Sequence, residues 1–202
     1  TGPPGAGKST LTNRIAYEYR QQGKTVGIIA VDPTSPFTGG AILGDRIRMN
    51  SLTLDKGVFI RSMGTRGSLG GLSHKTADAV KVMDAFGKDI IIVETVGVGQ
   101  SEVDIVKAAD TTMVVLIPGM GDDIQAIKAG ILEIGDLYCI NKSDLDGADK
   151  LVREINMMLD LDSFMTDWRP PITKVIASQD EGIKDLMVTV EKHRSYIDGN
   201  GK

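Results

Sequence analysis

The sequence predicts an α/β fold in which a mostly parallel β-sheet is covered by helices on both faces. Strand-like runs alternate with helical runs along most of the chain. The predicted strands, such as residues 25–31 (TVGIIAV) and 90–94 (IIIVE), are apolar apart from one end residue each. Continuous apolar strands are typical of a parallel sheet that is buried on both faces. With 202 residues, of which 41% are hydrophobic, the chain suits one domain with a sizeable core.

The first half of the chain begins with a helix over residues 8–22, which Gly23 ends as a C-terminal cap. The strand at 25–31 ends at Asp32, and prolines with a glycine pair then mark a loop. The further elements are a short helical stretch at 42–52, a strand at 57–62, a glycine-rich loop at 64–71, a helix from Ser73 to about Phe86, and a strand at 90–94.

The second half continues the alternation. We expect helices at 101–109, 123–134, 148–161 and 183–196, and strands at 111–117, 137–140 and 173–176. The segment around Trp168 is irregular. Cys139 lies within a predicted strand and is expected to be a small core residue, whereas His74 and His193 fall on predicted helices and are expected at the surface.

Residues 2–9 read GPPGAGKS and fit the phosphate-binding pattern G-x-x-x-x-G-K-[ST]. Gly2 and Gly7 let the backbone bend so that successive N–H groups point at phosphate oxygens. Lys8 would reach the β- and γ-phosphates, Ser9 would offer its hydroxyl to Mg²⁺, and the following helix adds the positive end of its dipole. The predicted phosphate-binding residues are Gly2, Pro3, Pro4, Gly5, Ala6, Gly7, Lys8, Ser9 and Thr10.

Residues 141–144 read NKSD and follow the apolar run 137–140 (LYCI), so they lie at a strand's carboxyl end, where open α/β sheets bind ligands. The Asp144 carboxylate can accept hydrogen bonds from N1–H and from the exocyclic amine of guanine, an edge that adenine does not present. Lys142 would lie along the base, and Asn141 would hold the two loops together. The two motifs together predict a guanine nucleotide as the ligand.

Three acids lie in loops that suit Mg²⁺, which prefers oxygen ligands. Asp32 and Glu94 each end an apolar strand, where an unpaired carboxylate would be costly. Asp45 is a weaker candidate from the residues alone, because Arg46 beside it could form an ordinary surface ion pair. Glu94 also begins the segment ETVG, in which the Gly97 amide is placed as a sensor of the γ-phosphate.

The catalytic residues are predicted less fully than the binding residues. Lys8 and Glu94 serve the phosphates and the metal, and Gln100 is the nearest candidate to orient the attacking water. A plain role for Gln100 in loop hydrogen bonding is about as well supported. Arg46 and Lys128 could stabilise transition-state charge if a loop closes or a partner docks. A module that binds the nucleotide without hydrolysing it therefore stays open.

Composition narrows the partners. Acidic residues exceed basic ones by 27 to 23, a net charge of −4, which argues against nucleic acid or an anionic membrane as the main partner. No apolar run approaches the roughly 20 residues that span a bilayer, and we see no secretory signal. One cysteine excludes an internal disulfide. The expected location is the cytoplasm.

Three segments resemble the MeaB/ArgK group of metallochaperone-type GTPases: residues 94–102 (ETVGVGQSE), 31–36 (VDPTSP) and 43–49 (LGDRIRM). The resemblance implies a P-loop NTPase fold of the SIMIBI class, with Ser9, Asp32, Asp45 and Glu94 around Mg²⁺. It also implies a mobile third switch at 118–128. The group's base-binding loop falls on Ile176, Ala177 and Ser178, where the usual first serine is missing.

The resemblance further implies a GTPase that accompanies adenosylcobalamin-dependent methylmalonyl-CoA mutase, gates cofactor delivery, and protects or reactivates the mutase. Residue 1 already lies inside the phosphate loop, which normally follows a strand. We therefore expect a G domain from a longer protein, without the first strand, the helical amino-terminal extension and the carboxyl-terminal dimerisation arm. The intact protein is expected to be a homodimer.

Two related kinds of protein would need features that this sequence lacks. A nickel-delivering GTPase would carry a His- or Cys-rich tract, and two histidines with one cysteine do not form one. An ArgK-type ATPase or kinase serving arginine and ornithine transport would need to bind adenine, which Asp144 argues against.

Overall fold

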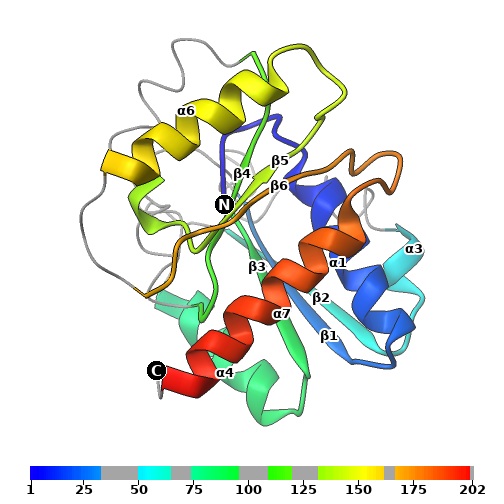
Figure 1. The fold of residues 1–202 in the computed structure, drawn as a ribbon. Coiled ribbons are helices and arrows are strands. Elements are labelled where there is room, and N and C mark those ends of the chain that lie inside the picture. Colours follow the sequence, from blue (N-terminus) through cyan, green and yellow to red (C-terminus); the bar gives the residue numbers. More distant parts are fainter. Residues whose placement is uncertain (33–49, 65–73, 96–108, 120–131, 162–166, 201–202) are drawn as a thin grey trace. The chain divides into compact units, whose positions relative to one another are not determined.

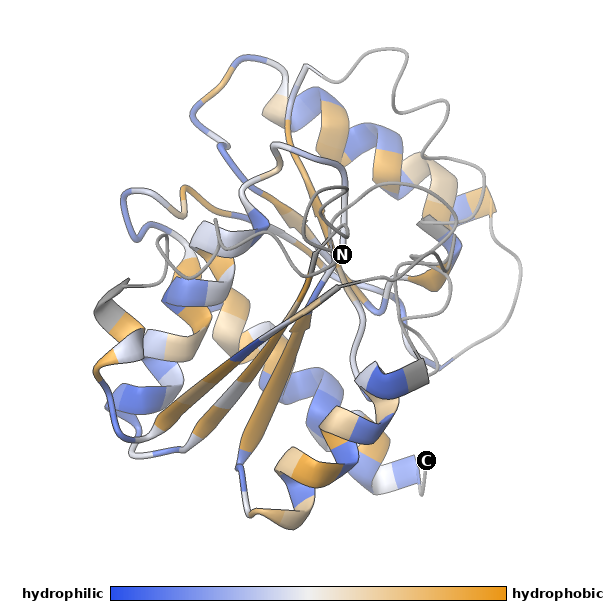
Figure 2. Ribbon diagram, turned by 180° about the vertical axis from the view of Figure 1, so that it is seen from behind, coloured by the Kyte–Doolittle hydropathy of each residue, from blue (hydrophilic) through white to orange (hydrophobic). Residues whose placement is uncertain are grey.

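The computed structural model describes residues 1–32, 50–64, 74–95, 109–119, 132–161 and 167–200. These residues form two compact units, Thr1–Ala109 and Asp110–Lys202. Each unit has a three-stranded parallel sheet of its own, as expected from the apolar strand runs (Figure 1). Figure 2 shows the strands as hydrophobic bands and the helices as ribbons of mixed character.

The sheet of the first unit has the strand order β2-β1-β3, with β1 at Val26–Asp32, β2 at Val58–Gly64 and β3 at Ile90–Glu94. All pairs are parallel, and Ala30 of β1 lies opposite Glu94 of β3. Asp32 and Glu94 therefore end neighbouring strands at the same edge of the sheet. Ligands of open α/β sheets bind at this carboxyl edge.

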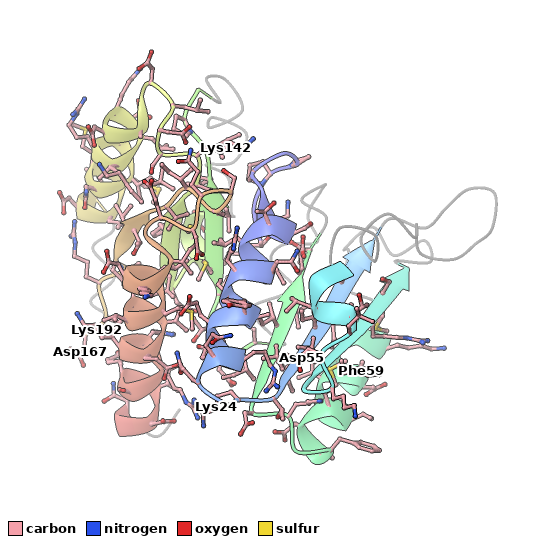
Figure 3. All side chains as sticks on the ribbon, turned by 90° about the vertical axis from the view of Figure 1, so that its right-hand side faces the viewer. Lys24, Asp55, Phe59, Lys142, Asp167 and Lys192 are labelled. Atoms are coloured by element: carbon pink, nitrogen blue, oxygen red, sulfur yellow. The ribbon has the colours of Figure 1, made fainter. Side chains whose placement is uncertain are left out.

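Helices α1 (Lys8–Gln21) and α4 (His74–Ala85) cover opposite faces of this sheet (Figure 3). Ile29 and Val31 of β1 pack against Met83 of α4. Ile28, which points to the other face because strand side chains alternate, is fully buried. A short helix, α3 (Asn50–Thr53), precedes β2.

The C-terminal end of α1 is closed as the sequence predicts. Gly23 has a φ of +78°, and its N–H donates to Arg20 O at 3.0 Å. The N–H of Lys24 donates to Tyr19 O at 3.0 Å, which completes a Schellman motif. This turn leads directly from α1 into β1.

The sheet of the second unit has the order β4-β5-β6, with β4 at Met113–Leu116, β5 at Leu137–Ile140 and β6 at Ile172–Lys174. Helix α6 (Ala148–Leu161) packs on the face that carries Tyr138 and Ile140. Helix α7 (Ile183–Asn200) meets the opposite face, where Thr173 Oγ1 lies 3.5 Å from Thr189 Oγ1. A 3₁₀ turn, η2 (Leu132–Ile134), leads into β5.

The surface position expected for His193 is wrong. Its side chain is only 3% exposed, between α7 and the loops before β4 and β5. Thr111 Oγ1 lies 2.8 Å from His193 Nδ1, and Asp136 Oδ1 lies 3.5 Å from Nε2. The ring of Trp168 packs against the imidazole in a tilted arrangement, at a centroid distance of 4.7 Å. These partners are far away in the sequence, so the pattern of α7 alone gave no sign of them.

The predicted bounds of β3, β5 and α6 are confirmed. Helix α7 continues past the predicted end at Tyr196 to Asn200, because neither Ile197 nor Asp198 is a helix-breaking residue. Residues 132–134, expected as the end of an α-helix, are 3₁₀, since the chain must turn at Gly135 to enter β5. Residues 101–108 of the predicted helix at 101–109 and residues 123–131 of that at 123–134 lie outside the described residues.

Of the described helices, none is both long enough and apolar enough to cross a lipid bilayer.

Candidate nucleotide-binding site

The phosphate loop owes its shape to three glycines in positive-φ conformations. The φ angles are +136° at Gly2, +78° at Gly5 and +84° at Gly7. No heavy atom lies within 4 Å of a Cβ built on Gly5, so that glycine is required by its backbone conformation and not by crowding. Between them, the Ala6 N–H donates to Pro3 O at 3.3 Å and closes a turn. The glycines predicted from the motif thus form a bent backbone that can present its amides to an anion.

The loop ends at the amino terminus of α1, where Gly7 is the N-cap residue. Among the described residues, no side chain caps the first turn, and the turn contains no acid. The first amides of a helix have no partner within the helix, and they carry the positive end of its dipole. This terminus is therefore suited to a phosphate.

Lys8 folds back over the loop. Its Nζ donates to Gly2 O at 2.8 Å and to Pro3 O at 2.9 Å. These bonds hold a positive charge beside the loop amides, where the phosphate chain of a nucleotide would lie. In this motif the lysine ammonium contacts the β- and γ-phosphates, so it has to lie beside the loop, as that of Lys8 does.

Ser9 and Glu94 meet although they are 85 residues apart. Ser9 Oγ donates to Glu94 Oε1 at 2.5 Å, and the Glu94 side chain is buried. A hydroxyl and a carboxylate are hard oxygen donors of the kind that Mg²⁺ prefers, and Mg²⁺ in such sites keeps waters and phosphate oxygens as further ligands. Asp32 ends the neighbouring strand, and Asp45 lies outside the described residues. No cluster of three His, Cys, Asp or Glu occurs in the described part of the chain.

The segment after β3 starts from a buried threonine. Thr95 is 3% exposed, and its Oγ1 donates to Thr1 Oγ1 at 2.9 Å, which ties this segment to the start of the phosphate loop. Gly97 and Gln100, the predicted phosphate sensor and water-orienting residue, lie outside the described residues.

The NKSD segment is held to a second loop by Asn141. Asn141 is 3% exposed, and its Oδ1 accepts hydrogen bonds from the N–H of Lys142 at 2.9 Å and from the N–H of Ala177 at 3.0 Å. Lys142, labelled in Figure 3, has a left-handed φ of +54°, which turns the chain at the end of β5. Asp144 is exposed, as a carboxylate that meets a base must be.

The loop that carries Ile176, Ala177 and Ser178 is closed on itself. Ile176 pairs with Glu181 in an antiparallel bridge, and Asp180 has a φ of +66°. Ala177 is buried and Ser178 is exposed. The structure thus brings together the NKSD loop and the predicted base-binding loop. The phosphate residues belong to the first unit and these residues to the second.

The roles of Ser143 and Gly182 in these loops were not predicted from the sequence. The Ser143 N–H donates to Val175 O at 3.1 Å, which joins the two loops a second time. Gly182 follows the bridge with a φ of +73°. The only sequence signal was a glycine directly before a helical pattern, which is a weak one.

Neither the Lys174–Asp149 pair near β6 nor the thiol of Cys139 supplies a reactive group. A hydrogen bond from Lys174 lowers the pKa of the exposed Asp149 carboxyl, which favours its ionised form. Burial raises the pKa of Cys139 to about 12, and the side chain is fully buried. Cys139 is therefore a core residue, as predicted, and not a nucleophile.

The family model described as methylmalonyl Co-A mutase-associated GTPase MeaB matches residues 1–202. A Pyrococcus abyssi protein named as a candidate GTPase is 57% identical over 205 residues, covering 100% of this chain and 63% of that protein. The Escherichia coli GTPase ArgK is 37% identical over 206 residues, covering 100% and 62%. The mouse mitochondrial methylmalonic aciduria type A homologue is 38% identical over 206 residues, covering 100% and 50%.

Solved structures give the same fold. A crystal structure of an LAO/AO transport system kinase matches with a TM-score of 0.79 and 29% identity, over 100% of this chain and 59% of that one. HypB from Helicobacter pylori, in complex with nickel, matches with a TM-score of 0.61 and 19% identity, over 97% and 86%. The second match shows the fold alone. The chain spans 63% and 65% of the length of two curated Pyrococcus relatives that it matches.

Proposed function

The chain belongs to the family of methylmalonyl-CoA mutase-associated GTPases, and on this premise we propose that it binds GTP with Mg²⁺ and hydrolyses it to GDP and phosphate. The observation that carries the proposal is the pairing of Ser9 with Glu94 directly behind a phosphate loop. A buried carboxylate bonded to a phosphate-loop serine is explained if these oxygens hold a divalent cation beside the phosphates.

On the phosphate side, the loop amides and Lys8 hold the β- and γ-phosphates. Ser9 and Glu94 hold the metal, with Asp32 at the end of the neighbouring strand and Asp45 as the further acids. Bound Mg²⁺ neutralises charge that develops on the phosphates. The Gly97 amide senses the γ-phosphate, and Gln100 orients the attacking water.

On the base side, Asp144 accepts the two guanine hydrogen bonds while Lys142 lies along the base. Ile176, Ala177 and Ser178 contact the base through their backbone. The Asn141 bonds to Lys142 and Ala177 support this assignment, because they fix both loops before any base arrives.

We further propose that the intact protein is a chaperone of an adenosylcobalamin-dependent methylmalonyl-CoA mutase, and a homodimer. GTP would gate cofactor delivery, and the GTPase would protect or reactivate the mutase. The family description and the name of the mouse relative support this role.

The similar structure titled as a transport system kinase raises a second candidate, an ATP-dependent kinase. Equilibrium titration with GDP and ADP, together with phosphate release from GTP and ATP, separates the two. We expect tight GDP binding, weak ADP binding and Mg²⁺-dependent phosphate release from GTP. Equal affinity for GDP and ADP would remove the guanine assignment, and GTP binding without phosphate release would leave a nucleotide-sensing module.

A further inference from the structure

We propose that Gly182 is a positioning residue for guanine discrimination, because it keeps Asp144 where its carboxylate can accept both guanine hydrogen bonds. The inference rests on the proposed function, since it concerns how the proposed base contact is held. Gly182 acts through the backbone of the neighbouring strand end and not through the base.

The space around Gly182 admits no side chain. A Cβ built on it would lie 2.3 Å from Lys174 O and 3.2 Å from Val175 Cα. Both contacts are backbone atoms, so no side-chain rotation can relieve the overlap. The φ of +73° is also one that residues with a side chain adopt at a cost.

Hydrogen bonds on both sides restrain Gly182 from moving away from this contact. On one side, the Ile176 N–H donates to Glu181 O at 3.0 Å and the Glu181 N–H donates to Ile176 O at 3.3 Å, which closes the loop. On the other side, Gly182 O accepts the N–H of Leu186 at 3.0 Å in the first turn of α7. Because both sides are fixed, a side chain at 182 would displace the Lys174–Val175 backbone instead.

A displacement of Val175 is transmitted to the NKSD loop by a hydrogen bond. Val175 O accepts the Ser143 N–H at 3.1 Å, and Ser143 immediately precedes Asp144. Val175 is also bonded to the end of β5, where its N–H donates to Ile140 O at 2.9 Å. A shift of Val175 therefore moves Asp144, and two simultaneous hydrogen bonds tolerate such a shift poorly.

The test compares GDP with inosine diphosphate, which lacks the exocyclic amine and so loses one of the two bonds to Asp144. The wild-type chain should prefer GDP by about 10- to 100-fold. In Gly182→Ala, we expect this preference to fall by about tenfold. The KM for GTP should rise while kcat at saturating GTP changes little, because the phosphate-binding residues are untouched.

Gly87→Ala is the matched control. Gly87 has nearly the same φ, +75°, but no atom lies within 4 Å of its Cβ, and it belongs to the first unit. This variant carries the same backbone strain without the collision. Its preference for GDP over inosine diphosphate should equal that of the wild type.

Equal weakening of GDP and inosine diphosphate in Gly182→Ala, or no weakening, would overturn the inference. If that variant does not fold, amide exchange in the nucleotide-free wild type decides. The Ser143 amide should be protected by about 100-fold or more, and free exchange there would overturn the proposed linkage. Wild-type binding of ADP as tight as that of GDP would instead refute the proposed function itself.

Discussion

Single buried polar residues at strand ends define the candidate site. Glu94 is 8% exposed and Asn141 is 3% exposed, and each ends or follows an apolar strand. Burying a polar group without a partner costs about 1–3 kcal/mol. Glu94 accepts a hydrogen bond from Ser9, and Asn141 accepts two from backbone amides. These bonds offset the cost of burial and fix both side chains.

Glu94 is the residue on which the metal prediction depends. In Glu94→Gln, Mg²⁺-dependent GTP binding should weaken and hydrolysis should be nearly abolished, because a neutral amide is a poor Mg²⁺ ligand. Binding of GDP without Mg²⁺ should persist. Magnesium titrations monitored by GTP affinity check this, with Glu154→Gln on the exposed face of α6 as the control. An unchanged magnesium titration would remove Glu94 from the metal site.

Asp144 is the residue on which base selection depends. Asp144→Ala should cost about 2–4 kcal/mol of GTP affinity, because a charge-assisted contact of two hydrogen bonds is lost. Asp144→Asn should shift the preference toward xanthine nucleotides, whose edge suits an amide. Calorimetric titration measures both, and Asp146→Ala, an exposed acid in the same loop, should bind GTP like the wild type.

A contact between α1 and the turn before β2 fixes the C-terminal end of α1. Arg20 of α1 forms a bidentate pair with Asp55, with N–O distances of 2.9 and 3.0 Å. Asp55 and Lys24 lie at the same end of this unit (Figure 3). A Cβ on Gly57 would overlap the Arg20 guanidinium, so a side chain there would push the guanidinium out of its present position in the pair. This pair joins the end of α1 to the start of β2.

The Arg20–Asp55 pair predicts a pH dependence of stability. Hydrogen bonds from Arg20 and from the Gly57 amide hold the pKa of Asp55 below its ordinary 3.8. The folded state therefore binds this proton less readily than the unfolded chain. The stabilisation is complete above about pH 5 and is lost as the pH falls through the lowered pKa.

Asp55→Asn should have a lower urea midpoint than the wild type at pH 7, and the two should converge as the pH falls toward 3. Urea unfolding across this range checks the prediction, with Asp78→Asn on the exposed side of α4 as the control. A difference that stayed constant with pH would show that the carboxylate charge of Asp55 does not stabilise the fold.

His193 holds α7 against the rest of the second unit. His193→Ala should cost about 2–4 kcal/mol of unfolding free energy, because it leaves a cavity beside Trp168 and removes the partner of Thr111. Lys192→Ala, next to it but exposed, should stay within about 0.5 kcal/mol of the wild type. Urea unfolding measures both, and equal stability of the two variants would mean that the buried cluster contributes nothing.

At the scale of the whole molecule, the proposed chaperone role requires that the GTP and GDP forms interact differently with the mutase. The intact protein should therefore hydrolyse GTP at least about tenfold faster with the mutase present. Reciprocity requires that the nucleotide also changes the affinity for the mutase. Phosphate release with and without mutase, and mutase pull-down in GDP and in a non-hydrolysable GTP analogue, measure both sides. The same rate with and without mutase would contradict the chaperone role.

The sequence by itself determined the fold class, the bounds of β3, β5 and α6, and the two nucleotide motifs. Each of these is written in a short window: the glycine spacing of residues 2–9, the apolar runs of β3 and β5, and the NKSD segment after a strand. Turn conformations and buried strands depend mainly on residues that are close together in the sequence, so a short segment is enough to predict them.

Only the tertiary structure decided which distant residues meet. It placed Ser9 on Glu94, tied Asn141 to Ala177, buried His193 under Trp168, and set Gly182 against the backbone of Lys174. The partners in these contacts lie between 8 and 85 residues apart. Their distances follow from the packing of parallel strands and their helices, and no local pattern in the chain encodes them.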